Sequence, residues 1–141
     1  MLLNTEQIET VVNQIEQAIQ LNIDGKKEDS LEVFLHIWNE LPEPKQEQPE
    51  QITNWIIDCI FNVYFDKQDY LKAKEWALRS LKNDTAQYDS YEYIQLGRVC
   101  YELNEFEEAM KYFSIAYERG KKRAFQEFDK KYWEFYSKNK K

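Results

Sequence analysis

Apolar residues recur along this chain at the spacing of amphipathic helices. Ile8, Val12, Ile15 and Ile19 follow one another at intervals of four, three and four residues, which places them on one helical face. After a polar break at residues 24–26, a second block carries a similar face, formed by Leu31, Phe34, Leu35, Trp38 and Leu41. The two blocks predict a helix pair over residues 6–41, with Thr5 as the N-cap of the first helix.

A proline-rich segment separates this pair from the rest of the chain. Residues 42–49 contain all three prolines of the sequence and no other apolar side chain. Proline removes a backbone donor and restricts the residue before it, so this composition predicts a loop. Pro49 suits the first turn of the helix that follows.

The remaining apolar blocks predict two further helix pairs, over residues 50–82 and 86–119, and a C-terminal helix over residues 124–137. The helix that begins near residue 50 is apolar on more than one side, which predicts that it packs on more than one side. A turn is expected at Asn104 and Glu105, and Gly120 is expected to end the sixth helix.

The second helices of the three pairs share a pattern. Small or large apolar residues recur at spacings of four and three, at an offset of 36 residues between the later two pairs and 43 between the earlier two. The proline segment accounts for the longer offset. The three sets are Ser30-Phe34-Ile37, Ala73-Ala77-Ser80 and Ala109-Phe113-Ala116.

This period and helix–turn–helix pattern resemble the tetratricopeptide repeat (TPR) family. The third unit carries the resemblance best, with Tyr93, Leu96-Gly97, Ala109, Phe113 and Ala116 at signature positions and Lys121 where a proline is usual. The earlier units are degenerate. In the second, Ile60-Phe61 replaces Leu-Gly, and the first keeps Ala18, Phe34 and Pro42. The resemblance implies an all-α, right-handed superhelix of antiparallel helix pairs, a TPR-like α-solenoid of about seven helices forming a single domain over residues 1–141.

The charge is unevenly distributed. The net charge is -7, but residues 1–69 hold fourteen Asp/Glu and four Lys/Arg, whereas residues 70–141 hold twelve and fifteen. The first part therefore carries -10 and the second +3. Nucleic-acid binding requires a basic face, so this distribution argues against it and favours a neutral or basic protein partner.

Residue types that support catalysis are sparse. The chain has no Ser/His/Asp or Cys/His arrangement, no Gly-rich phosphate loop and no Cys-x-x-Cys motif. Cys59 and Cys100 lie among apolar positions and are interpreted as small buried hydrophobes, and His36 has no second metal-type ligand near it. We expect no enzymatic activity, no metal and no cofactor. No apolar run is long enough to span a membrane and no secretory signal is evident, so a cytoplasmic protein is expected.

The TPR resemblance also implies where a partner would bind. In that family the first helices of successive pairs line a concave groove, and the matching positions here are Trp55, Asp58, Asn62, Phe65, Asp66, Tyr91, Ile94, Arg98, Tyr101 and Glu102. Trp, Tyr and Arg are frequent at protein interfaces. Asp58, Asp66 and Glu102 would repel a carboxylate, which disfavours capture of an anionic C-terminal tail. The alternative is that Trp55, Phe65 and Ile94 pack against neighbouring helices or the C-terminal segment.

These features predict a non-catalytic adaptor that binds a protein or peptide in its groove. A second hypothesis is an immunity-type inhibitor of a cognate bacterial toxin, because a small acidic protein would be steered towards a basic toxin. The sequence leaves the choice between them open, and it does not indicate the oligomeric state.

Overall fold

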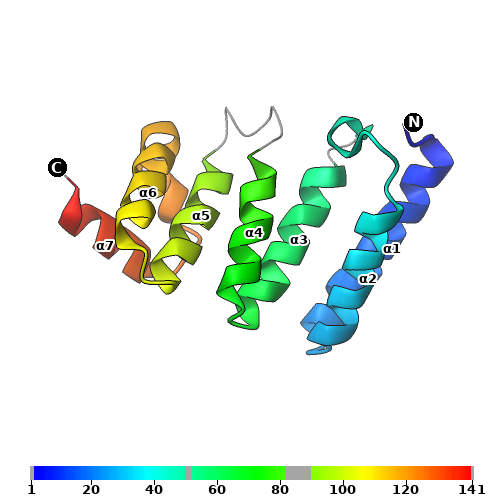
Figure 1. The fold of residues 1–141 in the computed structure, drawn as a ribbon, viewed down its shortest axis with the longest axis horizontal. Helices are drawn as coiled ribbons and strands as arrows, with labels where there is room; N and C mark the ends of the chain where they lie inside the picture. The colour runs from blue at the N-terminus through cyan, green and yellow to red at the C-terminus, as the bar shows by residue number, and fades with distance from the viewer. Residues whose placement is uncertain (1, 50–51, 82–89, 141) are drawn as a thin grey trace. The chain divides into compact units, whose positions relative to one another are not determined.

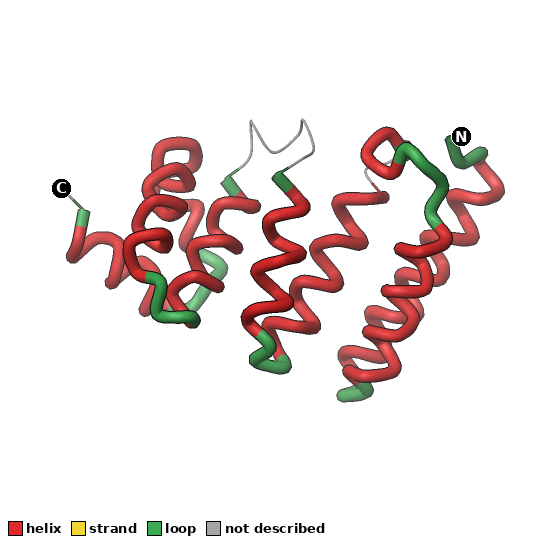
Figure 2. The backbone as a smooth tube through the Cα atoms, in the orientation of Figure 1, coloured by secondary structure: helices red, strands yellow, loops and turns green. Residues whose placement is uncertain are grey.

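The computed structural model describes residues 2–49, 52–81 and 90–140, and this part of the chain is built from helices joined by short connections (Figures 1 and 2). The α-helices are α1 (Thr5–Ile23), α2 (Lys27–Glu40), α3 (Ile52–Asp66), α4 (Tyr70–Ser80), α5 (Tyr91–Glu102), α6 (Phe106–Gly120) and α7 (Lys130–Asn139). Two 3₁₀ helices, η1 (Lys45–Glu47) and η4 (Lys121–Phe125), join them. Consecutive helices pack in pairs, which confirms the all-α, solenoid-like expectation.

The chain divides into two compact units, unit 1 (Met1–Trp76) and unit 2 (Ala77–Lys141), with the boundary inside α4. Each unit is described by itself below. The single domain over residues 1–141 and the right-handed sense of the superhelix remain predictions. The interruption expected at residues 83–85 lies outside the described residues, as does the predicted start of the third helix at residue 50.

The N-terminus of α1 is fixed by Asn4, not by Thr5 as the sequence suggested. The Asn4 side chain accepts a hydrogen bond from the Gln7 backbone N–H at 2.8 Å, and the Gln7 side chain accepts one from the Asn4 N–H at 2.9 Å. This reciprocal capping box satisfies two backbone donors that would otherwise lack partners. A capping box needs a Glu or Gln side chain three residues after the N-cap. Gln7 has this spacing from Asn4 but not from Thr5, so Thr5 is the first residue of the helix.

The close contact between α1 and α2 depends on a small residue. Ser30 is fully buried, and its hydroxyl donates a hydrogen bond to the Ala18 carbonyl at 2.7 Å. Ala18 is also fully buried. Two small side chains let the helices approach closely, and the hydrogen bond satisfies a polar group that would be costly to bury without a partner.

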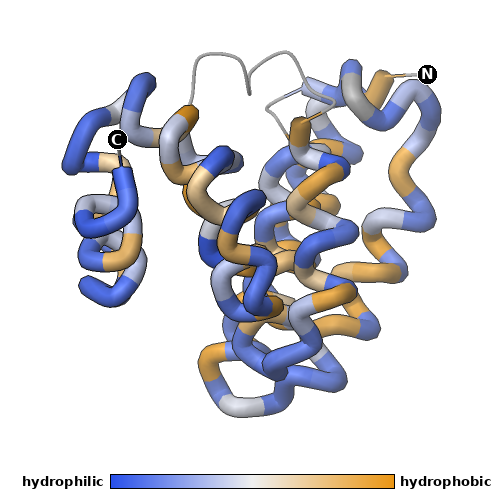
Figure 3. The backbone as a smooth tube through the Cα atoms, turned by 60° about the vertical axis from the view of Figure 1, so that its left-hand side comes forward, coloured by the Kyte–Doolittle hydropathy of each residue, from blue (hydrophilic) through white to orange (hydrophobic). Residues whose placement is uncertain are grey.

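Helix α3 is the most apolar helix of unit 1, as expected. Figure 3 shows how apolar and polar residues alternate along the helices. Helix α3 packs against both α2 and α1. Its buried residues are Ile52, Thr53, Ile56, Ile57, Ile60, Phe61 and Val63. The first turns of α4 join this unit through a ring contact of 5.1 Å between Trp38 and Trp76 and one of 5.2 Å between Phe65 and Tyr70.

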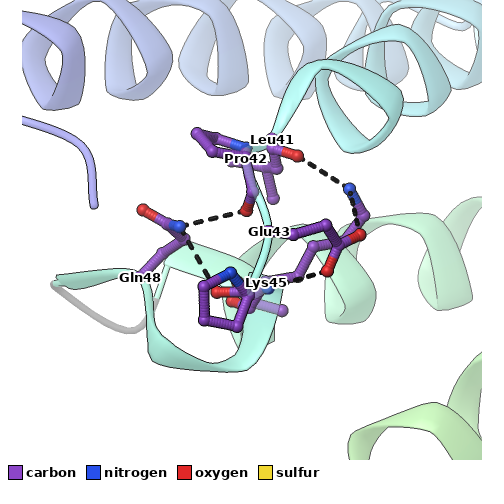
Figure 4. Close-up of polar contacts among 7 residues, drawn as sticks. Leu41, Pro42, Glu43, Lys45 and Gln48 are labelled. Atoms are coloured by element: carbon purple, nitrogen blue, oxygen red, sulfur yellow. Dashed lines mark hydrogen bonds and ion pairs between the residues drawn. The ribbon is translucent and has the colours of Figure 1, made fainter. Parts of the chain in front are cut away.

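The proline segment is a loop, as predicted, but one with its own network of polar contacts (Figure 4). The buried Gln48 side chain donates to the carbonyls of Pro42 and Pro44, at 3.0 and 3.3 Å, and accepts from the Leu3 N–H at 2.9 Å. The Lys45 ammonium donates to the Leu41 carbonyl at 2.8 Å. Gln48 therefore connects the loop to the segment that precedes α1.

In unit 2, α5 and α6 form an antiparallel pair around Gly97. Asn104 adopts a positive φ of 64° in the predicted turn, and the Glu105 N–H donates to the Cys100 carbonyl at 2.8 Å. A Cβ atom placed on Gly97 would overlap the ring of Phe113, which is fully buried. Glycine is thus required at this position by the close approach of the two helices.

The predicted C-terminal helix over residues 124–137 is wrong in extent. Residues 121–125 form η4, and α7 begins later, where the Asp129 side chain accepts a hydrogen bond from the Lys131 N–H at 3.0 Å. Helix α6 ends at Gly120 as expected, but the residue with positive φ is Lys121. Gly120 is needed for space, because a Cβ there would lie 2.9 Å from the Ser90 hydroxyl.

Candidate functional site

The ten predicted groove residues fall into two sets of five, one on α3 in unit 1 and one on α5 in unit 2. Four of the α3 residues, Trp55, Asp58, Asn62 and Asp66, follow one another at intervals of three, four and four. They therefore lie on one face of the helix. We call these four residues the α3 stripe. Asp66 is exposed and the other three are half-buried, so part of each side chain reaches solvent.

The polar residues of the α3 stripe are held by local contacts. The Asn62 amide donates to the Asp58 carboxylate at 3.4 Å, one turn away on the same helix. The Asp66 carboxylate lies 3.7 Å from the Lys27 ammonium, in an ion pair whose two side chains are 50% and 37% exposed. Exposed pairs of this kind contribute little to stability. The stripe therefore presents an indole and three short polar side chains, two of them carboxylates.

Phe65, the fifth α3 residue, has a different environment. Its ring stacks on Phe61 at 5.6 Å and meets the edge of Tyr70 at 5.2 Å. Phe61 is almost fully buried. Phe65 therefore packs between α3 and the start of α4, as in the alternative that Phe65 packs against neighbouring helices.

Cys59 lies beside the α3 stripe and is half-buried. Burial of the thiol, with a smaller contribution from the Asp58 charge, raises the pKa of Cys59 to about 12. Both effects disfavour the thiolate. Since the thiolate is the form that acts as a nucleophile or a metal ligand, Cys59 is an inert thiol at neutral pH.

This environment predicts slow alkylation of Cys59. In the folded protein at pH 8, iodoacetamide should modify Cys59 about one to two orders of magnitude more slowly than a free cysteine, because its thiolate fraction is small. Asp58→Asn should speed the reaction severalfold by removing the neighbouring charge. Mass spectrometry of tryptic peptides would follow Cys59 separately from Cys100, with denatured protein as the fast reference. Modification of native Cys59 at the reference rate would contradict the assignment.

Within the α5 set, Ile94 is not accessible to a partner. It is 1% exposed and belongs to the core that Phe113 and Ala116 form with the C-terminal residues. Ile94 thus follows the alternative of internal packing. The remaining four residues are half-buried and all contact the segment that follows α6.

Arg98 and Tyr91 lie against the C-terminal segment, by which we mean residues 121–139. The Arg98 guanidinium lies 4.6 Å from the ring centre of Phe128 and 5.4 Å from that of Tyr132, at cation–π distance. The Tyr91 ring lies 6.3 Å from Phe128, and its hydroxyl accepts a hydrogen bond from the Gln95 amide at 2.8 Å.

Tyr101 and Glu102 contact α7 itself. The Tyr101 ring meets the rings of Tyr132 and Phe135 edge-on, at 5.4 and 5.2 Å. The Lys131 ammonium donates to the Glu102 carboxylate at 2.7 Å, and this hydrogen bond raises the pKa of Lys131. The chain's own C-terminal segment therefore occupies the α5 set, whereas the α3 stripe has polar side chains on an accessible face.

One group of possible metal ligands occurs among the described residues. Donor atoms of Cys100, Glu105 and Glu108 lie within 4.8 Å of one another. Cys100 is fully buried, and its thiol lies 3.7 Å from the Glu108 carboxylate, which serves as its hydrogen-bond acceptor. Glu108 is exposed and Glu105 is half-buried, and the tight turn at Asn104 brings both carboxylates close to Cys100.

The fold and this accessible stripe define a class: an all-α, solenoid-like protein of paired helices. No model of a known protein family matches the chain, and no curated protein matches it in sequence at a significant level. None of the helices in residues 2–49, 52–81 and 90–140 combines the length and apolar character needed to cross a lipid bilayer.

Proposed function

We propose that this protein is a non-catalytic interaction module, TPR-like in its repeats, whose α3 stripe binds a protein or peptide. The observation that carries the proposal is the contrast between the faces of α3. Seven of its residues are buried, yet Trp55, Asp58, Asn62 and Asp66 remain accessible on one face. An aromatic side chain flanked by carboxylates suits an apolar anchor with neighbouring positive charge.

The charge of unit 1 supports a neutral or basic partner. Eight carboxylates on α1, α2 and the turn between them are exposed: Glu6, Glu9, Glu16, Asp24, Glu28, Asp29, Glu32 and Glu40. A surface of this kind accelerates encounter with a basic partner and weakens as salt is added. The same observation favours the narrower candidate, an immunity-type inhibitor of a basic bacterial toxin.

The two cysteines are free, which suits a reducing compartment, and we place the protein in the cytoplasm. The binding role needs no cofactor or metal. The C-terminal segment leaves α5 with few accessible groups, so the proposed contact surface is confined to the α3 stripe.

The test is a selection of binding peptides from a random displayed library, followed by affinity measurements. We expect selected peptides to carry an aromatic or aliphatic residue next to lysine or arginine. Trp55→Ala should weaken their binding by about thirtyfold, the loss of roughly 2 kcal/mol that a central aromatic contact provides. Asp58→Lys should weaken it about tenfold or more, because it reverses a charge that faces the ligand.

Glu16→Lys is the matched control, because it makes the same change in net charge at an exposed position on α1. It should leave affinity within about threefold, the effect of net charge alone. Equal losses in Asp58→Lys and Glu16→Lys, or no loss in Trp55→Ala, would show that the α3 stripe is not the binding surface. Circular dichroism of each variant checks that the helices are intact.

A further inference from the structure

A groove of about 670 Å³ lies between α6 and α7 within unit 2, and none of the ten predicted site residues on α3 and α5 lines it. Its apolar lining consists of Phe106, Met110, Phe135 and Tyr136. Phe106 is 44% exposed, which is unusual for a phenylalanine in a helix of a small protein. The volume of the groove falls in the range of pockets that bind ligands, about 300–1,000 Å³.

The lining is rigid on the side formed by Phe106. That ring lies 5.6 Å from Phe135 and 5.6 Å from Tyr101, in ring–ring contacts that fix its position although nearly half of it is exposed. A preformed apolar surface does not have to lose side-chain entropy when a ligand binds, which lowers the cost of association.

The charged residues of the groove are mostly positive. Lys111 from α6 and Lys140 just after α7 line it, against one carboxylate, Glu107. The same sign extends along the C-terminal part of the chain, because residues 121–141 hold eight Lys/Arg and three Asp/Glu, a net charge of +5. A ligand in this groove would therefore meet an excess of ammonium groups.

Beyond one end of the groove, further lysines gather over two stacked rings. Tyr117 and Trp133 stack at 5.9 Å, and the ammonium groups of Lys121, Lys122 and Lys140 lie 4.9–5.8 Å from the centres of one or both rings. Lys140 belongs to both the groove and this cluster. Lys140 therefore links the groove to the lysines over Tyr117 and Trp133.

We propose that the α6–α7 groove binds an acidic peptide segment of a partner protein, with one large apolar side chain placed over Phe106 and Met110 and carboxylates near Lys111 and Lys140. Charge complementarity carries this choice of occupant, and the apolar lining favours a peptide over a nucleic acid. The Glu107 carboxylate, which also lines the groove, would repel the phosphates of a nucleic acid. The groove and the α3 stripe would then take partners of opposite charge, so the protein would connect an acidic and a basic partner.

The test uses a fluorescein-labelled peptide of alternating glutamate and leucine or phenylalanine residues, titrated with the full-length protein and followed by fluorescence anisotropy. We expect binding that weakens with added salt. The same peptide with lysine in place of glutamate, or with alanine in place of the apolar residues, should bind at least about tenfold more weakly, because each lacks one of the two matching features.

The decisive variant is the double substitution Lys111→Glu and Lys140→Glu, matched by Lys130→Glu with Lys138→Glu. Lys130 and Lys138 are exposed residues of α7 that do not line the groove, and both doubles change the net charge equally. The groove double should lose about tenfold or more in affinity for the acidic probe, and the control should stay within about threefold. Equal losses in the two doubles, or no binding by the unmodified protein, would overturn the proposal.

Two other occupants are also tested. If a single-stranded oligonucleotide competes with the probe, and the competition is lost when Lys111 and Lys140 are substituted, the ligand of the groove is a nucleic acid. If the unmodified protein is a dimer in sedimentation equilibrium and the Lys111→Glu, Lys140→Glu variant is a monomer, the ligand of the groove is a second copy of the chain. Either result overturns the assignment to an acidic partner segment. Neither bears on the α3 stripe, whose variants lie in unit 1, so the two proposals fail separately.

Discussion

Gly97→Leu should destabilise unit 2 by about 3 kcal/mol or more, which corresponds to a fall of about 10 °C in Tm. The Cβ atom alone would overlap the buried ring of Phe113, and that ring is confined by Phe125, Tyr132 and Phe135 at centroid distances of 5.4–6.2 Å. Replacing a helical glycine ordinarily gains up to about 1 kcal/mol from helix propensity. Here the overlap with Phe113 costs more than the helix-propensity gain, so the substitution destabilises the protein.

Thermal unfolding followed by circular dichroism measures this effect. Glu118→Leu, an exposed position on α6, is the control and should change the free energy of unfolding by less than about 0.5 kcal/mol. Gly97→Ala should destabilise the protein less than Gly97→Leu does. The double variant Gly97→Ala with Phe113→Leu should be destabilised by less than the sum of the two single changes. An unchanged Tm in Gly97→Leu would mean that α5 and α6 do not cross as described.

Tyr132→Ala should cost about 3 kcal/mol and loosen α7 from α5. Tyr132 is 3% exposed, and its ring contacts both Tyr101 and Phe113. Removing a buried aromatic side chain loses its transfer free energy and leaves a cavity. It also removes one of the two rings on which the Arg98 guanidinium lies.

Tyr132→Phe is the matched control, because it keeps the ring and removes the hydroxyl. Its stability should stay within about 1 kcal/mol of the unmodified protein. Urea unfolding gives both values, and amide exchange in residues 130–139 reports on α7 directly. If both substitutions destabilise the protein equally, the hydroxyl and not the ring holds α7 in place.

The helices were predictable because each is specified locally. The intervals between Ile8 and Ile19 place α1, and the small residues Gly97 and Ala109 mark where α5 and α6 approach each other. The repeat alignment identified both from spacing, and the contact between Gly97 and Phe113 agrees with it. Membership of the TPR family itself remains a prediction, since helical pairs alone do not distinguish that family.

The accessible surface was less predictable, because it depends on contacts between distant parts of the chain. The TPR resemblance implied that Arg98, Tyr101 and Glu102 line an open groove. It could not show that Phe128, Tyr132 and Lys131 return to these residues, some thirty residues later in the sequence. The aromatic content of the C-terminal segment was a signal, since its nineteen residues include six aromatic side chains, more than a short solvent-exposed helix needs.

The groove between α6 and α7 was missed for a related reason. Phe106 is the first residue of α6, and the spacing of apolar residues did not mark it as exposed. Its 44% exposure depends on the angle at which α7 crosses α6, which no local pattern specifies. The groove was also hard to predict because α7 lies at residues 130–139 and not 124–137, and Lys140, just after its end, lines the groove.

The most direct test of the account is hydrogen–deuterium exchange of the unmodified protein with and without a selected peptide that carries lysine or arginine beside its apolar residue. The account predicts that the peptide slows exchange in residues 52–66, which carry the α3 stripe, and leaves residues 91–102 and 130–139 unchanged. Slower exchange in residues 91–102, together with faster exchange in residues 130–139, would contradict it. That result would show the partner displacing α7 from α5, the surface that the C-terminal segment occupies here.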